Sequence, residues 1–357
     1  MSKKPLILGI ESSCDETAAS LITENEEGFP VVLSSVVSSQ VEVHKEFGGV
    51  VPELAARSHI EKIDWIVKKA IDESGRKIEE IDAVASTAGP GLIVCLSVGL
   101  SFGKAFATAM NKPFIAVNHL EGHALSPKLN TNLNYPYLLL LISGGHSQYL
   151  SVQNLGKYKR LGTTIDDALG EAFDKTAKLL GIEFPGGPQI EILAKKGDPE
   201  KYDLPKPIFS KGGCNLSFAG LKTAVLKISK TIKSEQDKYD LAASFQKTIE
   251  EILYKKTKIA FTEFEKINEL NEKIFVVAGG VAANKKIRSM LINLCEENNY
   301  KSIFPPIEFC GDNAAMIAMV GLEKFKINQF DDLDYPAKPR WPLDEDAAFL
   351  KGAGVQL

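Results

Sequence analysis

The residues best suited to chemistry are two histidines, His119 and His123, in the segment 118–123 that directly follows the apolar run 113–117. Four positions apart on a helix, they lie about 40° apart around its axis and share one face. Two imidazoles so arranged can bind one metal ion. Glu121 lies about 200° around the axis from His119, whereas a metalloprotease of the His-Glu-x-x-His type needs its glutamate beside the metal. The pattern therefore indicates a metal site and argues against a peptidase.

The spacing by itself leaves an alternative open, because two unrelated surface histidines also occur at this distance. A candidate third ligand is Asp312, which follows a glycine at the start of an alanine-rich helical pattern. Its carboxylate either caps that helix or completes a site of two histidines and one carboxylate with open coordination positions. Spacing does not decide between these two roles.

Composition describes an ordinary globular protein. The chain has 357 residues, of which 44% are apolar and 25% charged, and it is long enough for two domains. It has neither an apolar run of about 18 residues nor a signal-peptide pattern at its start, so we expect no membrane span and a cytoplasmic location. The five cysteines are scattered without a C-x-x-C pair, which argues against a disulfide framework, a zinc ribbon or an iron–sulfur site.

The charge distribution is less uniform than the net charge of −4 suggests. Residues 195–234 carry nine lysines against three acidic residues. A locally basic surface is typical of a phosphate-binding footprint, and we expect Lys206, Lys211 and Lys222 to contribute to it. The alternative is a lysine-rich face that is merely solvated.

Three strand–turn segments recur along the chain. Residues 6–22 and 137–150 each consist of an apolar run, a small polar turn and a second apolar run, which is typical of a β-hairpin whose turn directs N–H groups toward an anion. Residues 274–284 resemble a buried parallel strand that ends in a glycine turn at a helix N-terminus. Helical patterns cover 165–181 and 241–260, and a constrained turn follows at 184–188.

This recurrence in two halves resembles the actin-like ATPase and sugar-kinase superfold, an α/β architecture of two lobes. The resemblance implies a nucleotide and a metal in the cleft between the lobes. We expect one lobe from residues 1–117 and 325–357, and a second from 118–324 that carries the metal pair, the substrate loops and a helical insertion. The alternative for any one glycine turn is that it only closes a hairpin.

Nearly the whole chain resembles the bacterial tRNA adenosine threonylcarbamoyltransferase family TsaD, whose members were formerly described as O-sialoglycoprotein endopeptidases. Eleven motifs carry the resemblance: GIESSCDET at 9–17, GGVVPELAARSH at 48–59, TAGPGL at 87–92, NHLEGH at 118–123, LLISGGH at 140–146, DDALGEAFDKTAKLLG at 166–181, FPGGP at 184–188, SFAGLKT at 217–223, AGGVAAN at 278–284, FCGDNAAMIA at 309–318 and PRWPLD at 339–344.

The resemblance implies a specific reaction. Members of this family move a threonylcarbamoyl group from threonylcarbamoyl-adenylate, which a separate synthase makes, to the exocyclic amine of an adenine beside the anticodon. The tRNAs concerned read codons that begin with A. The implied partners are the tRNA, a TsaB-like paralogue without the metal site and a TsaE-like ATPase, with no membrane.

The resemblance also assigns site residues. It implies that His119, His123 and Asp312 bind one divalent ion, iron(II) or zinc. The positions that match substrate-binding residues are Ile142, Ser143, Gly144, Gly145, His146, Asp174, Gly187, Glu191 and Asn284, although many relatives have aspartate in place of Glu191. Asp15 and Glu16 match acidic turn residues that the family needs for activity.

These residue types suit the implied reaction. A metal held by two imidazoles and one carboxylate keeps open positions and can polarise a substrate oxygen. The backbone donors of 143–145 can hold a phosphate or stabilise developing negative charge. Asp15 or Glu16 could accept the proton of the adenine amine, which is a poor nucleophile.

Two other functions fit the sequence less well. A kinase on the same superfold usually has Asp-x-Gly in its first turn, whereas residues 11–16 contain no glycine and add negative charge that would repel a γ-phosphate. A non-catalytic nucleotide-binding scaffold would have no need of His119, His123 and Asp312.

Overall fold

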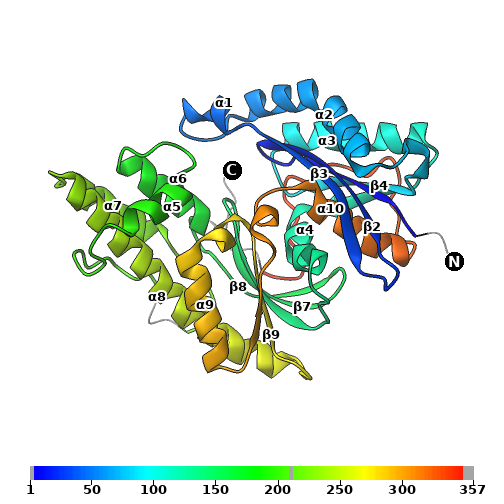
Figure 1. Ribbon diagram of the computed structural model, residues 1–357. Coiled ribbons are helices and arrows are strands. Elements are labelled where there is room, and N and C mark those ends of the chain that lie inside the picture. Colours follow the sequence, from blue (N-terminus) through cyan, green and yellow to red (C-terminus); the bar gives the residue numbers. More distant parts are fainter. Residues whose placement is uncertain (1–3, 209–211, 349–357) are drawn as a thin grey trace. The chain divides into compact units, whose positions relative to one another are not determined.

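The computed structural model describes residues 4–208 and 212–348, and it divides the chain into two compact units. Unit 1 consists of Met1–Leu133 and Pro305–Glu345, and unit 2 consists of Asn134–Phe304 and Asp346–Leu357. Each unit contains a five-stranded mixed sheet (Figure 1).

Unit 1 begins with a hairpin and continues with alternating helices and strands. Its elements are β1 (Ile7–Glu11), β2 (Glu16–Glu24), β3 (Pro30–Ser39), α1 (Val41–Lys45), α2 (Pro52–Ser74), η1 (Ile78–Glu80), β4 (Ala83–Gly89), α3 (Ile93–Ala109), β5 (Phe114–Asn118), α4 (His119–Leu125), η2 (Ser126–Leu129), η4 (Ile307–Phe309) and α10 (Ala314–Lys326). The strand order is β3-β2-β1-β4-β5, in which β1, β4 and β5 are parallel and β2 and β3 run antiparallel to their neighbours.

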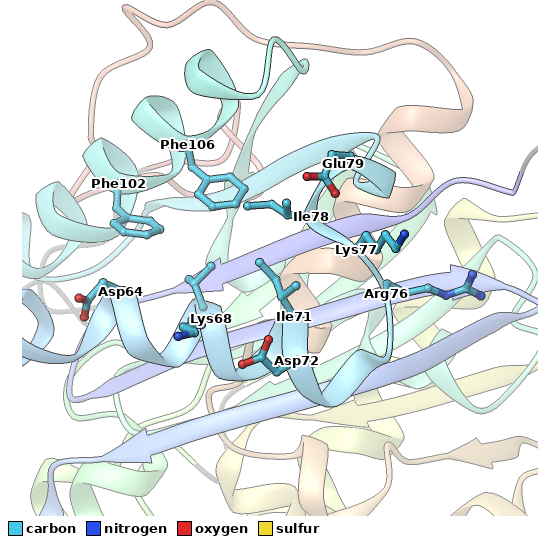
Figure 2. Close-up of a pocket in the computed structure, with 11 residues that line it drawn as sticks. Asp64, Lys68, Ile71, Asp72, Arg76, Lys77, Ile78, Glu79, Phe102 and Phe106 are labelled. Atoms are coloured by element: carbon cyan, nitrogen blue, oxygen red, sulfur yellow. The ribbon is translucent and has the colours of Figure 1, made fainter.

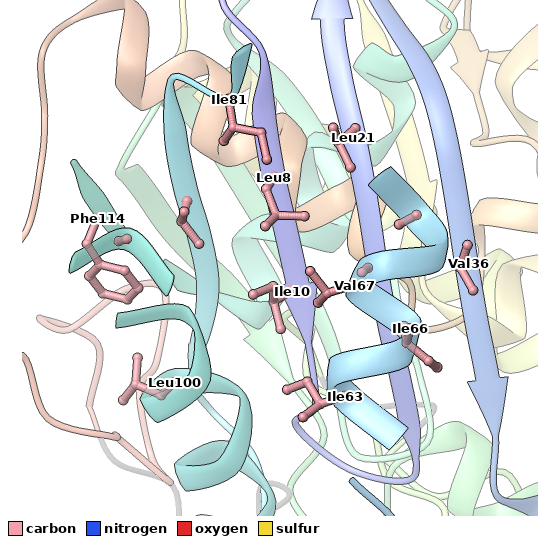
Figure 3. Packing of buried hydrophobic residues seen from close by; sticks show 14 of the residues in the cluster. Leu8, Ile10, Leu21, Val36, Ile63, Ile66, Val67, Ile81, Leu100 and Phe114 are labelled. Atoms are coloured by element: carbon pink, nitrogen blue, oxygen red, sulfur yellow. The ribbon is translucent and has the colours of Figure 1, made fainter. Parts of the chain in front are cut away.

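Helices cover both faces of the first sheet, which explains why β1 is buried throughout. Because successive strand residues point to opposite faces, Leu8 and Ile10 meet Ile63 and Ile66 of α2 in one apolar cluster (Figure 3). The other face packs against α10, where a Cβ atom on Gly9 would lie 2.4 Å from the carbonyl oxygen of Ala314. Glycine is therefore required at this close approach between strand and helix.

Unit 2 repeats the same order of strands. Its elements are β6 (Tyr137–Ile142), β7 (Ser147–Asn154), β8 (Lys157–Thr163), α5 (Leu169–Leu179), α6 (Gly186–Ala194), α7 (Ala219–Ser229), α8 (Glu235–Ile267), β9 (Ile274–Ala278), η3 (Gly280–Ala283), α9 (Lys285–Glu297) and β10 (Lys301–Ile303). The strand order is β10-β9-β6-β7-β8, with β6, β9 and β10 parallel and the hairpin strands antiparallel.

The expected strand–turn segments are confirmed. Residues 6–22 and 137–150 form the hairpins β1–β2 and β6–β7, and 274–284 form the parallel strand β9 with a turn that leads into α9. The helix expected over 165–181 begins later, at Leu169. One reason is that the Asp166 carboxylate accepts a hydrogen bond from Phe218 N at 2.7 Å and so serves the start of α7.

The division into units differs from the lobes expected from the sequence. Residues 118–133 and 305–324 belong to unit 1, and so does the metal pair that we expected in the second lobe. The physical reason is packing: α10 lies on β1, and Gly122 of α4 lies close enough to α10 that an added Cβ would contact Met316 at 3.1 Å. Among the helices of the described segments, none has the length and apolar character that crossing a bilayer requires.

Candidate functional site

The junction between β5 and α4 fixes the first part of the candidate metal site. Asn118 is the N-cap of α4, since its Oδ1 accepts hydrogen bonds from Leu120 N at 2.9 Å and Glu121 N at 3.4 Å. Its Nδ2 donates to the carbonyl oxygen of Trp341 at 3.0 Å. Both ends of this amide are therefore occupied, and α4 begins at a defined residue, His119.

The two imidazoles of α4 face the same space. The rings of His119 and His123 lie 4.8 Å apart between centroids at an interplanar angle of 87°. Both histidines are buried, and His123 is completely so. Glu121 points elsewhere, with its Oε2 3.6 Å from Lys324 Nζ, and so takes no part in the cluster.

Asp312 completes the cluster from the segment before α10. The N-cap of α10 is the next residue, Asn313, whose Oδ1 accepts from Met316 N at 2.9 Å. Capping is thus not the role of Asp312, whose Oδ1 lies 3.1 Å from His123 Nε2 and 3.5 Å from His119 Nε2. The ligand atoms of the three residues all lie within 4.8 Å of one another.

The charges in this cluster depend on one another. Burial by itself would raise the pKa of Asp312, but His119 and then His123 hold that pKa well below its usual value. Burial would lower the pKa of His119, but Asp312 and Glu11 outweigh it and raise the pKa well above its usual value. The ionised form of the Asp312 carboxylate, which is the form that binds metals, is therefore favoured.

Glu11, the last residue of β1, is a part of the cluster that the sequence did not predict. Its Oε2 lies 3.1 Å from His119 Nδ1, and the Ser13 hydroxyl lies 3.2 Å from the same nitrogen. The signal in the sequence was an acidic residue ending an otherwise apolar strand, immediately before the turn that contains Asp15 and Glu16.

Of the predicted catalytic residues, Asp15 lies in the turn between β1 and β2, and Glu16 is the first residue of β2. Asp15 is buried, and its backbone oxygen accepts from Gln40 N at 3.1 Å. Burial, followed by the charges of Asp312 and Asp15, raises the pKa of Glu16 well above its usual value. His59 supports the turn from α2, because its Nε2 donates to the Cys14 carbonyl oxygen at 3.0 Å.

The predicted substrate residues belong to unit 2, where Ile142 ends β6 and residues 143–146 form the turn that follows. Ser143 N donates to the carbonyl oxygen of His146 at 2.8 Å, which closes the turn after Ile142. Gly144 and Gly145 have open space where a side chain would stand, and within the described residues their backbone N–H groups donate no hydrogen bond. Two free donors at the end of a buried strand are suited to an anionic group.

Asp174 and Gly187 lie at the connection between α5 and α6. The Asp174 Oδ1 accepts from Gly186 N at 2.8 Å and so fixes the start of α6. A Cβ atom on Gly187 would meet only Phe173 Cβ, at 3.9 Å. The structure therefore gives Asp174 a positioning role and leaves the surface of Gly187 open.

Asn284 and Glu191 meet at the N-terminus of α9. Asn284 Oδ1 caps the helix by accepting from Lys286 N at 3.1 Å and Ile287 N at 3.0 Å, while Glu191 Oε1 accepts from Lys285 N at 3.1 Å. Asn284 Nδ2 donates to Gln246 Oε1 at 3.2 Å.

Gln246 itself was not predicted as a site residue. The available signal was a polar residue inside the apolar pattern of α8, where it is buried.

Ion pairs reduce the free charge of the basic segment 195–234. Lys206 pairs with Glu251, and Lys222 lies 3.3 Å from Asp167. Lys211 lies outside the described residues. The exposed lysines for which the described residues contain no such pair include Lys227, Lys230 and Lys233.

A separate pocket of unit 1 lies between α2 and α3 and has a volume of about 440 Å³ (Figure 2). Its walls combine apolar side chains such as Ile71, Phe102 and Phe106 with charged ones such as Asp64 and Lys68. None of the metal or substrate residues lines it. The pocket is therefore not where the predicted chemistry would take place.

Comparison with known proteins identifies the family. The profile of the family described as "TsaD: tRNA N6-adenosine threonylcarbamoyltransferase" matches residues 31–319. A protein of that name from Pelagibacter ubique is 81% identical over 357 residues, which is 100% of both chains. Another from Rickettsia conorii is 53% identical over 342 residues, or 95% of this chain and 98% of the relative.

The chain belongs to the TsaD family. Solved structures of more distant proteins agree on the fold of this TsaD chain. HypF from T. kodakarensis matches with a TM-score of 0.62 at 13% identity, over 94% of this chain and 50% of that chain. The (R)-2-hydroxyglutaryl-CoA dehydratase component A from Acidaminococcus fermentans matches with a TM-score of 0.51 at 14% identity, over 90% and 98% of the chains. The expected α/β superfold of actin-like ATPases and sugar kinases is confirmed.

Proposed function

We propose that this chain transfers a threonylcarbamoyl group from threonylcarbamoyl-adenylate to the exocyclic amine of the adenine beside the anticodon, in tRNAs that read codons beginning with A. The observation that carries the proposal is the convergence of His119, His123 and Asp312 in a chain of the TsaD family. In the transfer, a bond forms between the adenine nitrogen and the carbamoyl carbon. The bond from that carbon to the phosphate oxygen breaks, and AMP leaves.

The three residues fit one divalent metal ion. Two imidazole nitrogens and one carboxylate oxygen form a donor set used by both non-haem iron and zinc, and it leaves coordination positions open. We propose iron(II) or zinc as the cofactor. When bound, the ion would supply Lewis-acid polarisation of a substrate oxygen. The side chain of Asp312 is 23% exposed, whereas that of His123 is fully buried, so the carboxylate is the ligand nearer to solvent.

We assign the adenylate to the loops of unit 2. The free N–H groups of Gly144 and Gly145 suit its phosphate, and the open surface at Gly187 permits close approach of a flat base. Asn284 and Glu191 are already engaged at the N-terminus of α9, which supports a role in shaping this region alongside any direct contact.

The amine that attacks must lose a proton. We assign its acceptor to the acidic turn, with Glu16 favoured over Asp15 because Glu16 is partly exposed and Asp15 is buried. The buried Asp15 then contributes negative charge and turn geometry.

The same proposal includes the partners and the location. A TsaB-like paralogue, a TsaE-like ATPase and the tRNA itself follow from the family resemblance, as does a cytoplasmic location.

A reconstituted transfer assay tests the function. It contains the purified chain, the synthase, the partner proteins, ATP, threonine, bicarbonate and unmodified tRNA, and the modified nucleoside is measured by mass spectrometry. We expect modification that depends on this chain and on a tRNA reading A-starting codons. Absence of the modified nucleoside would contradict the proposed transfer, and ATP turnover by the isolated chain at an enzymatic rate without tRNA would favour the kinase alternative.

A further inference from the structure

The carboxylate of Glu11 is buried at the end of β1 and hydrogen-bonded on both oxygens. Its Oε1 accepts from Ser13 N at 2.5 Å, and its Oε2 accepts from the Thr87 hydroxyl at 2.6 Å. The third contact is His119 Nδ1, 3.1 Å from Oε2. Glu11 has an exposed fraction of 0%, so its charge is removed from water entirely.

Burying a carboxylate is costly unless nearby charges and donors compensate for it. Two neutral donors, Ser13 N and the Thr87 hydroxyl, satisfy hydrogen bonds but supply no opposite charge. His119 is the cationic or metal-bound group in direct contact with the carboxylate. The burial of the Glu11 carboxylate is therefore best explained by its interaction with the His119 ring.

The two histidines of the cluster differ in the hydrogen-bond partners of Nδ1, the ring nitrogen that does not face Asp312. His119 directs Nε2 toward Asp312 and Nδ1 toward Glu11 and Ser13. His123 also directs Nε2 toward Asp312, but its buried Nδ1 has no hydrogen-bond partner within the described residues. Only one of the two ligands thus has a carboxylate behind it.

Charge balance gives a second argument. Two neutral imidazoles and the carboxylate of Asp312 would leave a divalent ion with one uncompensated positive charge in a largely buried site. The carboxylate of Glu11 supplies the missing negative charge through His119. A carboxylate behind a metal-bound histidine also fixes the ring orientation and increases the basicity of the ligand.

We propose that Glu11 is a positioning residue of the metal centre: its carboxylate accepts the Nδ1–H of His119, which leaves Nε2 free to bind the ion. This inference rests on the metal assignment of the proposed function. It adds a residue from β1 to a site otherwise built from α4 and the segment before α10.

The variant Glu11→Gln tests the inference because it keeps the size of the side chain. Its carboxamide oxygen can still accept from Ser13 N, while its NH₂ group would face Thr87 and His119. An NH₂ group directed at Nδ1 favours the tautomer that has its proton on Nε2, which is the wrong nitrogen for binding. We expect the affinity for Zn²⁺ alone, measured by competition with a chelator, to fall by about 10- to 100-fold.

Two controls separate positioning from a general effect on the turn. Thr87→Val removes the other donor to the same carboxylate oxygen, and we expect it to change Zn²⁺ affinity far less than Glu11→Gln does. Glu11→Asp keeps the charge on a shorter side chain and should restore part of the affinity. The thermal unfolding of all metal-free variants is followed in parallel, and Glu11→Gln should stay folded because a neutral amide is less costly to bury than a carboxylate.

The outcomes distinguish the inference from the function on which it rests. If the wild-type chain fails to bind Zn²⁺ stoichiometrically, the metal assignment itself is wrong. If the wild-type chain binds and Glu11→Gln binds equally well, only the role of Glu11 is overturned. The role of Glu11 would also be overturned if Thr87→Val and Glu11→Gln lowered the Zn²⁺ affinity equally. If Glu11→Gln is unfolded, Glu11→Asp replaces it in the test, and a Zn²⁺ affinity of Glu11→Asp no higher than that of Thr87→Val would overturn the role.

Discussion

The Nε2 atom of His123 lies 3.1 Å from Oδ1 of Asp312, although the two residues are 189 positions apart in the sequence. This contact is possible because α4 and α10, which follow different parts of the chain, pack against each other within unit 1. The cap of α10, the alternative role considered for Asp312, comes from Asn313 instead. The carboxylate is left facing the two imidazoles, which is the arrangement expected of a metal ligand.

Removing either histidine should therefore remove the metal. We expect His119→Ala and His123→Ala to lose the stoichiometric ion and the transferase activity, with the free energy of unfolding of the metal-free protein lowered by about 1–3 kcal/mol. Elemental analysis of the purified variants measures the first effect. His44→Gln is the matched control, because His44 is also buried in unit 1 but contacts Gln40 and Val51 instead of the cluster. Full metal occupancy in both alanine variants would contradict the assignment.

Local patterns predicted the parts of the site that lie close together in the sequence. The apolar run before Asn118 and the spacing of His119 and His123 predicted a strand, a helix start and two side chains on one face, as the structure has them. Glu11 was missed because its partner is 108 positions away. No local signal connects the end of β1 with the start of α4, and only the pairing of both β1 and β5 with β4 brings them together.

The division of the chain was mispredicted for a related reason. The segment from residue 305 to residue 324 directly follows unit 2 in the sequence, and for this reason we expected it to belong to the second lobe. Its actual neighbours are set by the small residues Gly9 and Ala318, which allow α10 to approach β1 closely. Such long-range fit between a strand and a helix leaves no periodic pattern in either segment.

Gly187 offers a test of the adenylate site that can be separated from folding. Because a Cβ atom there would meet only Phe173 Cβ, at 3.9 Å, Gly187→Val should fold normally and should weaken binding of a non-hydrolysable adenylate analogue at least about tenfold. Titration calorimetry measures the affinity. The neighbouring substitution Gly186→Val is a contrasting control, since its Cβ would lie 2.3 Å from Ala177 Cβ, and overpacking of this kind costs about 1–3 kcal/mol. Unchanged affinity in Gly187→Val would remove this glycine from the site.

Substitution of Glu16 tests whether its carboxylate accepts the proton of the adenine amine. Glu16→Gln keeps the shape of the side chain but cannot accept a proton, so we expect kcat to fall by about 10²- to 10⁴-fold while metal content stays unchanged. Rates are measured with saturating tRNA and threonylcarbamoyl-adenylate, which excludes effects on binding. Asp15→Asn serves as the comparison within the same turn. A wild-type rate in Glu16→Gln would exclude this carboxylate as the acceptor.

His59 should make stability depend on pH in a defined direction. Burial lowers the pKa of His59 below its usual value, and the ring is held by the Thr17 hydroxyl at 2.7 Å and the Cys14 carbonyl oxygen at 3.0 Å. As pH falls below about 6.5, the unfolded chain takes up a proton at this position before the folded chain does. The stability that His59 contributes is therefore fully present at pH 8 and is lost as pH falls through its folded-state pKa.

Denaturant unfolding of metal-free wild type and His59→Gln between pH 8 and pH 5 measures this effect. The difference in unfolding free energy between the two proteins should be largest at pH 8 and should shrink toward pH 5. Taking the difference removes the contributions of other titrating groups, including His119. A difference that stays constant would mean that the pKa of His59 is the same in the folded and unfolded chains, and a difference that grows at low pH would mean that folding raises this pKa.

The basic segment 195–234 provides the prediction about tRNA. The lysine count of this segment overestimated its free positive charge. Glu251 and Asp167, which neutralise Lys206 and Lys222, lie outside the segment and were not included in the count. The lysines around the end of α7 are better placed to contact phosphates, since they are exposed and their side chains form no ion pair within the described residues.

We therefore expect the triple variant with Lys227, Lys230 and Lys233 replaced by glutamate to weaken tRNA binding and to reduce the slope of log affinity against log salt by about one for each phosphate that is no longer neutralised. Lys206→Glu/Lys222→Glu, the matched variant, should change the slope less, because lysines already paired with acids neutralise fewer phosphates and so displace fewer counterions from the tRNA. Filter binding at several salt concentrations measures both quantities, and metal content serves as the control for folding. Wild-type affinity and slope in the triple variant would mean that these lysines form only a solvated face, and that the tRNA surface lies on another part of the chain or on its partners.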